Sequence, residues 1–307
     1  MARNQCDRCR RWGVVGAFGL LGLSLLAAPA QAQEQQYTRG QQVFPVYEGW
    51  EKNADGSFSL VFAYFNRNFE EVIDVPVGPD NRLEPGGPDQ GQPSHFYPRR
   101  SRFLFRVRVP SDFGKKELIW TVTANGKTER AYGTLLTEYF IDKLVITANT
   151  GGAGTTGGGD AALHANEPPA LKVEGETMRT ARVGAPVALV ATAHDDGIPK
   201  VRSMPPSIPG ITSRLAPNSA TGLRVSWFVY RGAGAVTFSP TQITEWEDSR
   251  DGANSPLAPG WKTPPVPEGN RWVAQATFAE PGTYVLRCQA HDGALPVVKD
   301  ITFVVTK

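Results

Sequence analysis

Acidic residues that could hold a cation follow two β-forming segments of the chain. Asp195 and Asp196 end one apolar run, and Asp292 ends another. Carboxylate oxygens are the ligands that calcium prefers in proteins. We therefore name four candidate calcium ligands: Glu167, Asp195, Asp196 and Asp292.

A simpler explanation exists for the same aspartates. Aspartate often begins a turn, because its side chain accepts a hydrogen bond from the backbone two residues further on. We favour this explanation over a metal site. A zinc site built on His194 and His291 has less support, since structural zinc usually takes four ligands and no further histidine or thiolate is evidently placed.

A second candidate site lies in a Pro/Ser/Gly-rich stretch between residues 246 and 270. Tryptophans beside polar groups can stack on sugar rings or anchor a protein contact. The candidate ligand-binding residues are Trp246, Trp261, Asp248 and Arg250. Alternatively, the two tryptophans fold back to cover an open sheet, which is the commoner role of a loop tryptophan.

Other chemistry-bearing groups give weaker indications. The chain has no Gly-x-Ser-x-Gly or His-Glu-x-x-His motif. Glycosidase carboxylates leave no local signature, so a polysaccharide hydrolase stays open as an alternative.

The arginines of 99–102 could bind an acidic polymer, but they fit the solvated face of a strand equally well, and we favour that second interpretation. Cys288 is expected to be a buried, inert thiol.

Residues 1–32 have the pattern of a cleaved export signal. Arginines precede an uncharged apolar run from Val14 to Ala28, which is too short for a membrane span, and Ala30-Gln31-Ala32 then supplies a cleavage sequence. We expect a secreted or periplasmic protein with no membrane span after cleavage. Loss of the leader's arginines brings the 32 basic and 30 acidic residues close to balance, which gives no reason to expect nucleic acid as a partner.

The rest of the chain is expected to form two domains. Residues 148–167 are rich in glycine and lack apolar periodicity, as in a flexible linker. They separate an N-terminal domain, 38–147, from a C-terminal domain, 168–307. Both halves show short strand patterns, so the fold class is all-β, with two antiparallel immunoglobulin-like β-sandwiches.

Three segments illustrate the strand patterns of the N-terminal half. Apolar and polar residues alternate from Phe103 to Val109, which indicates a half-buried strand. Asn125-Gly126 between two strand-like runs predicts a tight hairpin. Residues 138–146 are also β-rich and are expected to form a strand.

Motifs in the C-terminal half resemble a known family. Glu280-Pro281-Gly282-Thr283-Tyr284 is similar to the entry to strand F of immunoglobulin-like domains. Ser226-Trp227, followed by a glycine-rich turn at 232–234, resembles PKD-type repeats. The resemblance covers 168–307 and implies a β-sandwich in which the tyrosine hydroxyl bonds to backbone at a sheet corner.

The resemblance also implies a place for the candidate cation ligands. In an immunoglobulin-like sandwich the B–C and F–G loops emerge at the same end, so Asp195, Asp196 and Asp292 should gather near the incoming linker, as at the interdomain ion sites of cadherin-like chains. The expected function is a non-catalytic contact with an extracellular protein or glycan. A polysaccharide hydrolase, or an accessory subunit of one, is the alternative.

Overall fold

A computed structural model describes residues 37–154, 161–207 and 218–307. The predicted export signal lies outside these residues. Gln36–Lys307 forms one compact unit. Among the described residues, no helix is both long and apolar enough to span a membrane.

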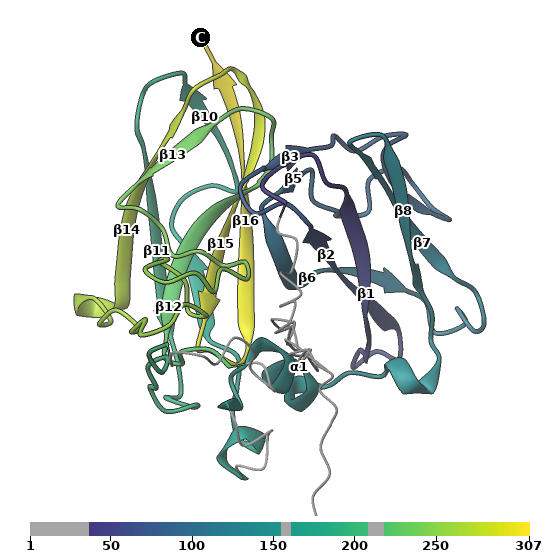
Figure 1. Cartoon of the computed structure of the whole chain (residues 1–307), viewed down its shortest axis with the longest axis horizontal. Helices are drawn as coiled ribbons and strands as arrows, with labels where there is room; N and C mark the ends of the chain where they lie inside the picture. The colour runs from purple at the N-terminus through teal and green to yellow at the C-terminus, as the bar shows by residue number, and fades with distance from the viewer. Residues whose placement is uncertain (1–36, 155–160, 208–217) are drawn as a thin grey trace, which may run out of the picture. The chain divides into compact units, whose positions relative to one another are not determined.

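The N-terminal half is a sandwich of two three-stranded sheets, most of whose strands are labelled in Figure 1. One sheet has the order β1-β2-β6: Val43–Lys52, Phe58–Asn66 and Arg99–Val109. The other has the order β4-β7-β8: Asn81–Glu84, Leu118–Ala124 and Lys127–Gly133. A short ribbon pairs β3 with β5: Ile73–Asp74 and His95–Phe96. Phe62, Phe105 and Trp120 meet in the core between the sheets.

Two of the predicted N-terminal elements are confirmed. Asn125 and Gly126 have positive φ values of 49° and 72° and join β7 to β8 in a tight hairpin. Along β6, Phe105 and Val107 are buried, whereas Arg106 and Arg108 are exposed. An irregularity in the pairing of β6 with β2 surrounds Phe103, which packs in a separate small cluster with Ile141 and Leu295.

The strand predicted for residues 138–146 is wrong. A 3₁₀ turn, η1 (Thr137–Tyr139), and a helix, α1 (Lys143–Thr150), occupy this segment. The Asp142 side chain caps the helix by accepting the backbone N–H groups of Leu144 and Val145, both at 2.9 Å. Gly151 ends it with a φ of 86°. The two end caps therefore outweigh the β-branched composition of the segment.

The predicted linker contains some regular structure. Its first residues belong to the end of α1, and Ala161–His164 forms the short helix η3. The domain boundaries themselves stay a prediction.

The C-terminal half has the strand order of an immunoglobulin-like sandwich. One sheet runs β13-β14-β11-β9: Val236–Ser239, Arg271–Phe278, Val187–His194 and Ala170–Val173. The other runs β10-β16-β15-β12: Met178–Arg182, Pro296–Thr306, Gly282–His291 and Arg224–Arg231. All pairs are antiparallel except β10 with β16. The first sheet corresponds to strands D-E-B-A and the second to G-F-C with an added parallel edge, so the predicted fold class is confirmed.

The predicted tyrosine corner is present in this sandwich. The Tyr284 hydroxyl donates to the backbone oxygen of Glu280 at 2.9 Å. A Cβ atom on Gly232 or Gly234 would overlap the Tyr284 side chain, so the glycines of this turn are required by close packing. Cys288 is fully buried as predicted, and burial raises the pKa of its thiol, which makes it a poor nucleophile.

Candidate functional site

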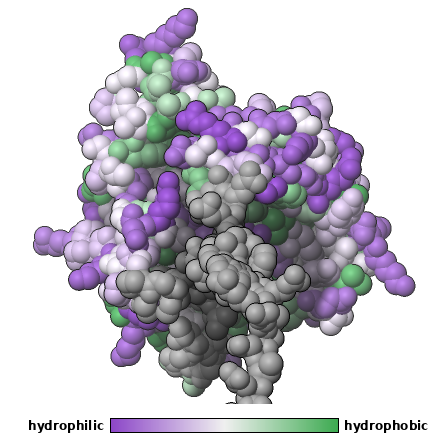
Figure 2. Space-filling view, in the orientation of Figure 1, coloured by the Kyte–Doolittle hydropathy of each residue, from purple (hydrophilic) through white to green (hydrophobic). Residues whose placement is uncertain are grey.

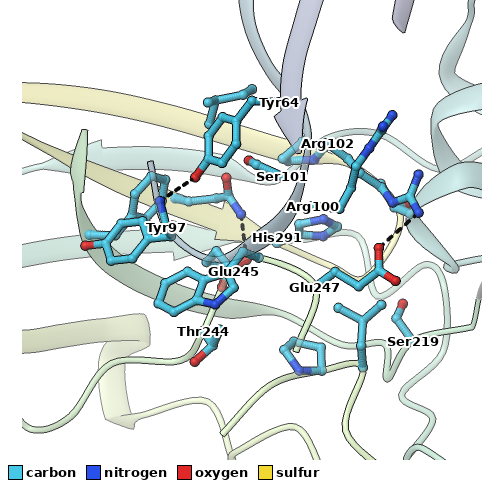
Figure 3. A pocket seen from close by; sticks show the side chains of 18 of the residues that line it. Tyr64, Tyr97, Arg100, Ser101, Arg102, Ser219, Thr244, Glu245, Glu247 and His291 are labelled. Atoms are coloured by element: carbon cyan, nitrogen blue, oxygen red, sulfur yellow. Dashed lines mark hydrogen bonds and ion pairs between the residues drawn. The ribbon is translucent and has the colours of Figure 1, made fainter. Parts of the chain in front are cut away.

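A concave site is lined by side chains from both sandwiches, and we call it the junction cleft (Figure 3). Strand β6 and the segment just before it contribute one side of the lining, strands β12 and β15 contribute another, and residues 244–247 contribute a third. The lining residues used below are Tyr64, Tyr97, Arg100, Arg102, Ser219, Arg224, Glu245, Trp246, Glu247, Gln289 and His291.

Two stacked aromatic rings form part of the apolar lining of the cleft. Trp246 lies flat against Tyr97, with ring centroids 4.1 Å apart and planes 6° from parallel. Tyr97 is fixed by two hydrogen bonds. Its hydroxyl accepts the backbone N–H of Val229 at 3.0 Å, and its backbone N–H donates to the Tyr64 hydroxyl at 2.9 Å. Burial raises the pKa of Tyr97 to about 12. Both the stack and its supports therefore remain uncharged over the physiological range.

The loop that carries Trp246 is held against β6. Glu247 donates its backbone N–H to the oxygen of Arg100 at 2.7 Å and accepts from the Arg102 guanidinium at 3.3 Å (Figure 3). Arg100 also pairs with Glu48 at 2.8 Å. These contacts fix the tryptophan relative to the arginines of β6.

A buried polar network forms the floor of the cleft. Glu245 accepts hydrogen bonds from Ser226 at 2.7 Å and from Gln289 at 2.6 Å, so both of its oxygens are engaged. Arg224 is only 5% exposed, and its Nε atom is 4.0 Å from Glu245 Oε1, which is too long for a hydrogen bond. Burial lowers the pKa of Arg224, while Glu245 and Asp292 oppose that shift. Arginine nevertheless keeps its charge in proteins.

His291 lies beside this network as a neutral ring. Its Nδ1 atom accepts the backbone N–H of Gly293 at 2.9 Å, which places the ring proton on Nε2. Burial lowers the pKa of His291, and the Arg224 charge lowers it further. The ring therefore offers a hydrogen-bond donor to the cleft without adding a positive charge.

The four candidate ligand-binding residues do not come together. Trp246 lines the junction cleft, whereas Trp261 is absent from its lining and donates to Asn254 Oδ1 at 3.0 Å. Asp248 and Arg250 form a local ion pair at 2.6 Å, also outside the lining. Their roles in ligand binding stay predictions, with only Trp246 placed at a concave surface.

Hydrogen bonds connect the segments that carry the candidate calcium ligands, but the Glu167 carboxylate pairs with Lys143 at 3.1 Å. Asp196 accepts the backbone N–H of Glu167 at 3.0 Å, and Asn166 donates to Asp292 at 3.1 Å. Burial raises the pKa of Asp195 to about 6, with further increases from the Asp292 and Asp196 charges.

The same aspartates also make the turns that we favoured. Asp195, Asp196 and Asp292 each accept a backbone N–H from the residue two positions on, at 3.0, 2.8 and 2.6 Å. Within residues 37–154, 161–207 and 218–307, no group of three or more acidic, histidine or cysteine side chains is placed to hold a metal ion. His194 bonds to Asn270 at 2.8 Å rather than to a second metal ligand. Calcium and zinc sites therefore gain no support from the observed geometry.

Sequence reasoning missed most of the residues in the cleft. Arg106 and Arg108 do form the solvated face of β6, where they pair with Glu51 and Asp55. Arg100 and Arg102, by contrast, line the cleft. Arg224 carried one overlooked signal, because it is a charged residue at the start of the largely apolar run 225–230.

Comparisons with known proteins give no family for this chain. No protein-family model matches it, and no curated protein matches it. Solved structures that match include a chimeric titin Z1Z2, at 10% identity over 86% of this chain and 97% of that one, with a TM-score of 0.23. The Yersinia pseudotuberculosis adhesin InvE matches at 10% identity over 88% and 61%, with a TM-score of 0.24.

Domains 4 and 5 of the S-layer protein SbsC match at 8% identity over 63% of this chain and 66% of that one, with a TM-score of 0.21. Scores this low carry no argument about function. The class of the protein, a pair of β-sandwiches of which the C-terminal one is immunoglobulin-like, rests on its own strand order.

Proposed function

We propose that this chain is an exported, non-catalytic protein that binds an extracellular protein or glycan, and that the junction cleft is its contact site. The observation that carries the proposal is the Trp246–Tyr97 stack beside Arg100 and Arg102 in one concave surface. Aromatic and arginine side chains are the groups most enriched at binding hot spots.

The face of the molecule drawn in Figure 2 is compatible with contact in water. In the view of Figure 2, hydrophilic side chains alternate with small apolar areas on the coloured surface.

The polysaccharide hydrolase remains the alternative, because Glu247 also lines the cleft. Among the described residues, its carboxylate is held only by Arg102 at 3.3 Å, whereas both oxygens of Glu245 are engaged. Glu247 is therefore the residue to change when testing for hydrolysis.

The test combines binding and turnover on the purified mature chain. We expect binding on a panel of glycans and purified extracellular proteins, with a loss of at least tenfold in Trp246→Ala. Trp261→Ala is the comparison variant, since it changes a tryptophan of the same 246–270 stretch that does not line the cleft. Glycan turnover abolished by Glu247→Gln would overturn the non-catalytic assignment, and binding that survives Trp246→Ala would move the contact site elsewhere.

A further inference from the structure

We propose that the junction cleft binds a saccharide through a carboxylate group, with Arg224 and Arg100 as the donors to the carboxylate and Trp246 as the surface for the sugar ring. This inference rests on the proposed function and specifies its ligand.

The first argument is the incomplete hydrogen bonding of the buried Arg224 guanidinium, which has Glu245 as an ion-pair partner only at 4.0 Å. Its guanidinium is buried, and its one hydrogen bond within the described residues goes to the backbone oxygen of Ala220 at 3.5 Å. The Nε atom has no hydrogen-bond partner in that part of the chain. Both oxygens of the adjacent Glu245 are already engaged. Glu245 therefore offsets the charge of Arg224 without hydrogen-bonding to it, and an anion that accepted hydrogen bonds from the guanidinium would be stabilised in the cleft.

Further unsatisfied groups line the same cleft. The Nε atom of Arg100 is buried and has no hydrogen-bond partner among the described residues. The same holds for the hydroxyl of Ser219, whose residue is 1% exposed. Carboxylates accept several hydrogen bonds and pair best with guanidinium groups. Two arginines and a hydroxyl therefore match a carboxylate better than a neutral group.

The rest of the lining favours a sugar as the carrier of that carboxylate. Trp246 is partly exposed and flat, and the rigid Tyr97 stack behind it keeps it in one orientation. Glu247 can accept a hydrogen bond from a sugar hydroxyl, and the Nε2–H of His291 can donate one. An acidic monosaccharide has the matching groups: an apolar ring face for the tryptophan, hydroxyls for the polar side chains and one carboxylate for the arginines.

The experiment measures binding of acidic sugars and their uncharged counterparts by calorimetry. Tri-galacturonate represents a uronic acid, and its methyl ester removes only the charge. Sialyllactose and lactose form a second matched pair, which distinguishes a sialic acid source from a uronic one. We expect at least one acidic member to bind at least tenfold more tightly than its neutral partner, and free acetate to bind far more weakly.

Variants of the cleft arginines complete the test. Arg224→Gln and Arg100→Gln should each remove the preference for the acidic sugar, and Arg100→Gln decides the matter if Arg224→Gln fails to fold. Arg108→Gln is the control, because Arg108 pairs with Asp55 on the exposed face of β6.

Equal affinity for acidic and neutral sugars, an acidic preference that survives Arg100→Gln, or acetate binding as tightly as the saccharides would overturn the inference. So would binding of neutral glycans or extracellular proteins alone, although the proposed function would then survive. Absence of binding to every glycan and protein tested would overturn both.

Discussion

The guanidinium of Arg287 lies over the ring of Tyr230, 3.5 Å from its centroid. Arg287 also pairs with Asp300 at 2.7 Å and donates to the backbone oxygen of Leu104 at 2.6 Å. One side chain of the C-terminal sandwich thus contacts a strand of the N-terminal sandwich. Arg287 and Tyr230 are almost fully buried, so their cation–π contact is shielded from water, whereas the Asp300 side chain is 39% exposed.

Replacing Arg287 should therefore destabilise the protein substantially. Arg287→Ala would remove the cation–π contact and leave the Leu104 oxygen unsatisfied, and we expect a loss of about 2–4 kcal/mol in the free energy of unfolding. Urea denaturation followed by tryptophan fluorescence measures it. Arg106→Ala removes an exposed ion pair with Glu51 and should change stability by less than about 1 kcal/mol. Equal effects of the two variants would contradict this prediction.

The tyrosine corner gives a second stability prediction. Tyr284→Phe removes one hydrogen bond to Glu280 and should lower the free energy of unfolding by about 1 kcal/mol. Gly234→Ala should have the larger effect, about 1–3 kcal/mol, because the added methyl group overlaps the tyrosine hydroxyl. Thermal melting of both variants tests the order, and a larger effect for Tyr284→Phe would show that the turn can move aside.

Asp195 should make stability depend on pH. Its folded-state pKa of about 6 lies above the ordinary aspartate pKa of 3.8, so the folded protein binds more protons than the unfolded chain between these two values. The free energy of unfolding should fall as pH rises through this window. A shift of this size corresponds to about 3 kcal/mol, which solvent screening of the partly exposed carboxyl reduces to about 1 kcal/mol. Melting curves from pH 4 to 7 should show this decline, and Asp195→Asn should flatten it.

Calcium offers an independent check on the same acidic loops. If calcium binds there, it should raise the melting temperature at pH 7 in the original chain and have no effect in Asp195→Asn. The observed turns predict no calcium effect in either protein. If calcium raised the melting temperature of the original chain but not that of Asp195→Asn, the calcium-site hypothesis would be supported.

Export is tested by the N-terminus of the mature protein. Cleavage after Ala32 would leave Gln33 as the first residue, and N-terminal sequencing of protein recovered outside the cytoplasm should find it. Recovery of the intact leader from the cytoplasm would contradict the predicted secreted or periplasmic location.

Local signals allowed much of the fold to be predicted. Asn125-Gly126 and the segment around Tyr284 act over a few residues, so their structures could be inferred from neighbouring residue types. Helix α1 escaped prediction because its propensity is weak and its stability comes from the caps at Asp142 and Gly151. Short helices depend more on such ends than on a long apolar stripe.

The junction cleft could not be predicted in the same way. Tyr97 and Trp246 are far apart in the sequence, and nothing near either residue indicates that their rings stack. The unsatisfied Arg224 becomes evident only when the surrounding strands are placed in three dimensions. Contacts of this kind depend on tertiary packing, about which single-sequence patterns carry little information.

Strand β12 has a place in both hydrophobic cores. Trp227 and Val229 pack inside the C-terminal sandwich, while Phe228 and Tyr230 belong to the cluster of the N-terminal one. If either half were produced alone, hydrophobic residues that the other half normally covers would be exposed to solvent, and we expect that half to aggregate. Under a pulling force, we expect the two sandwiches to unfold together in one cooperative step and not as two independent domains.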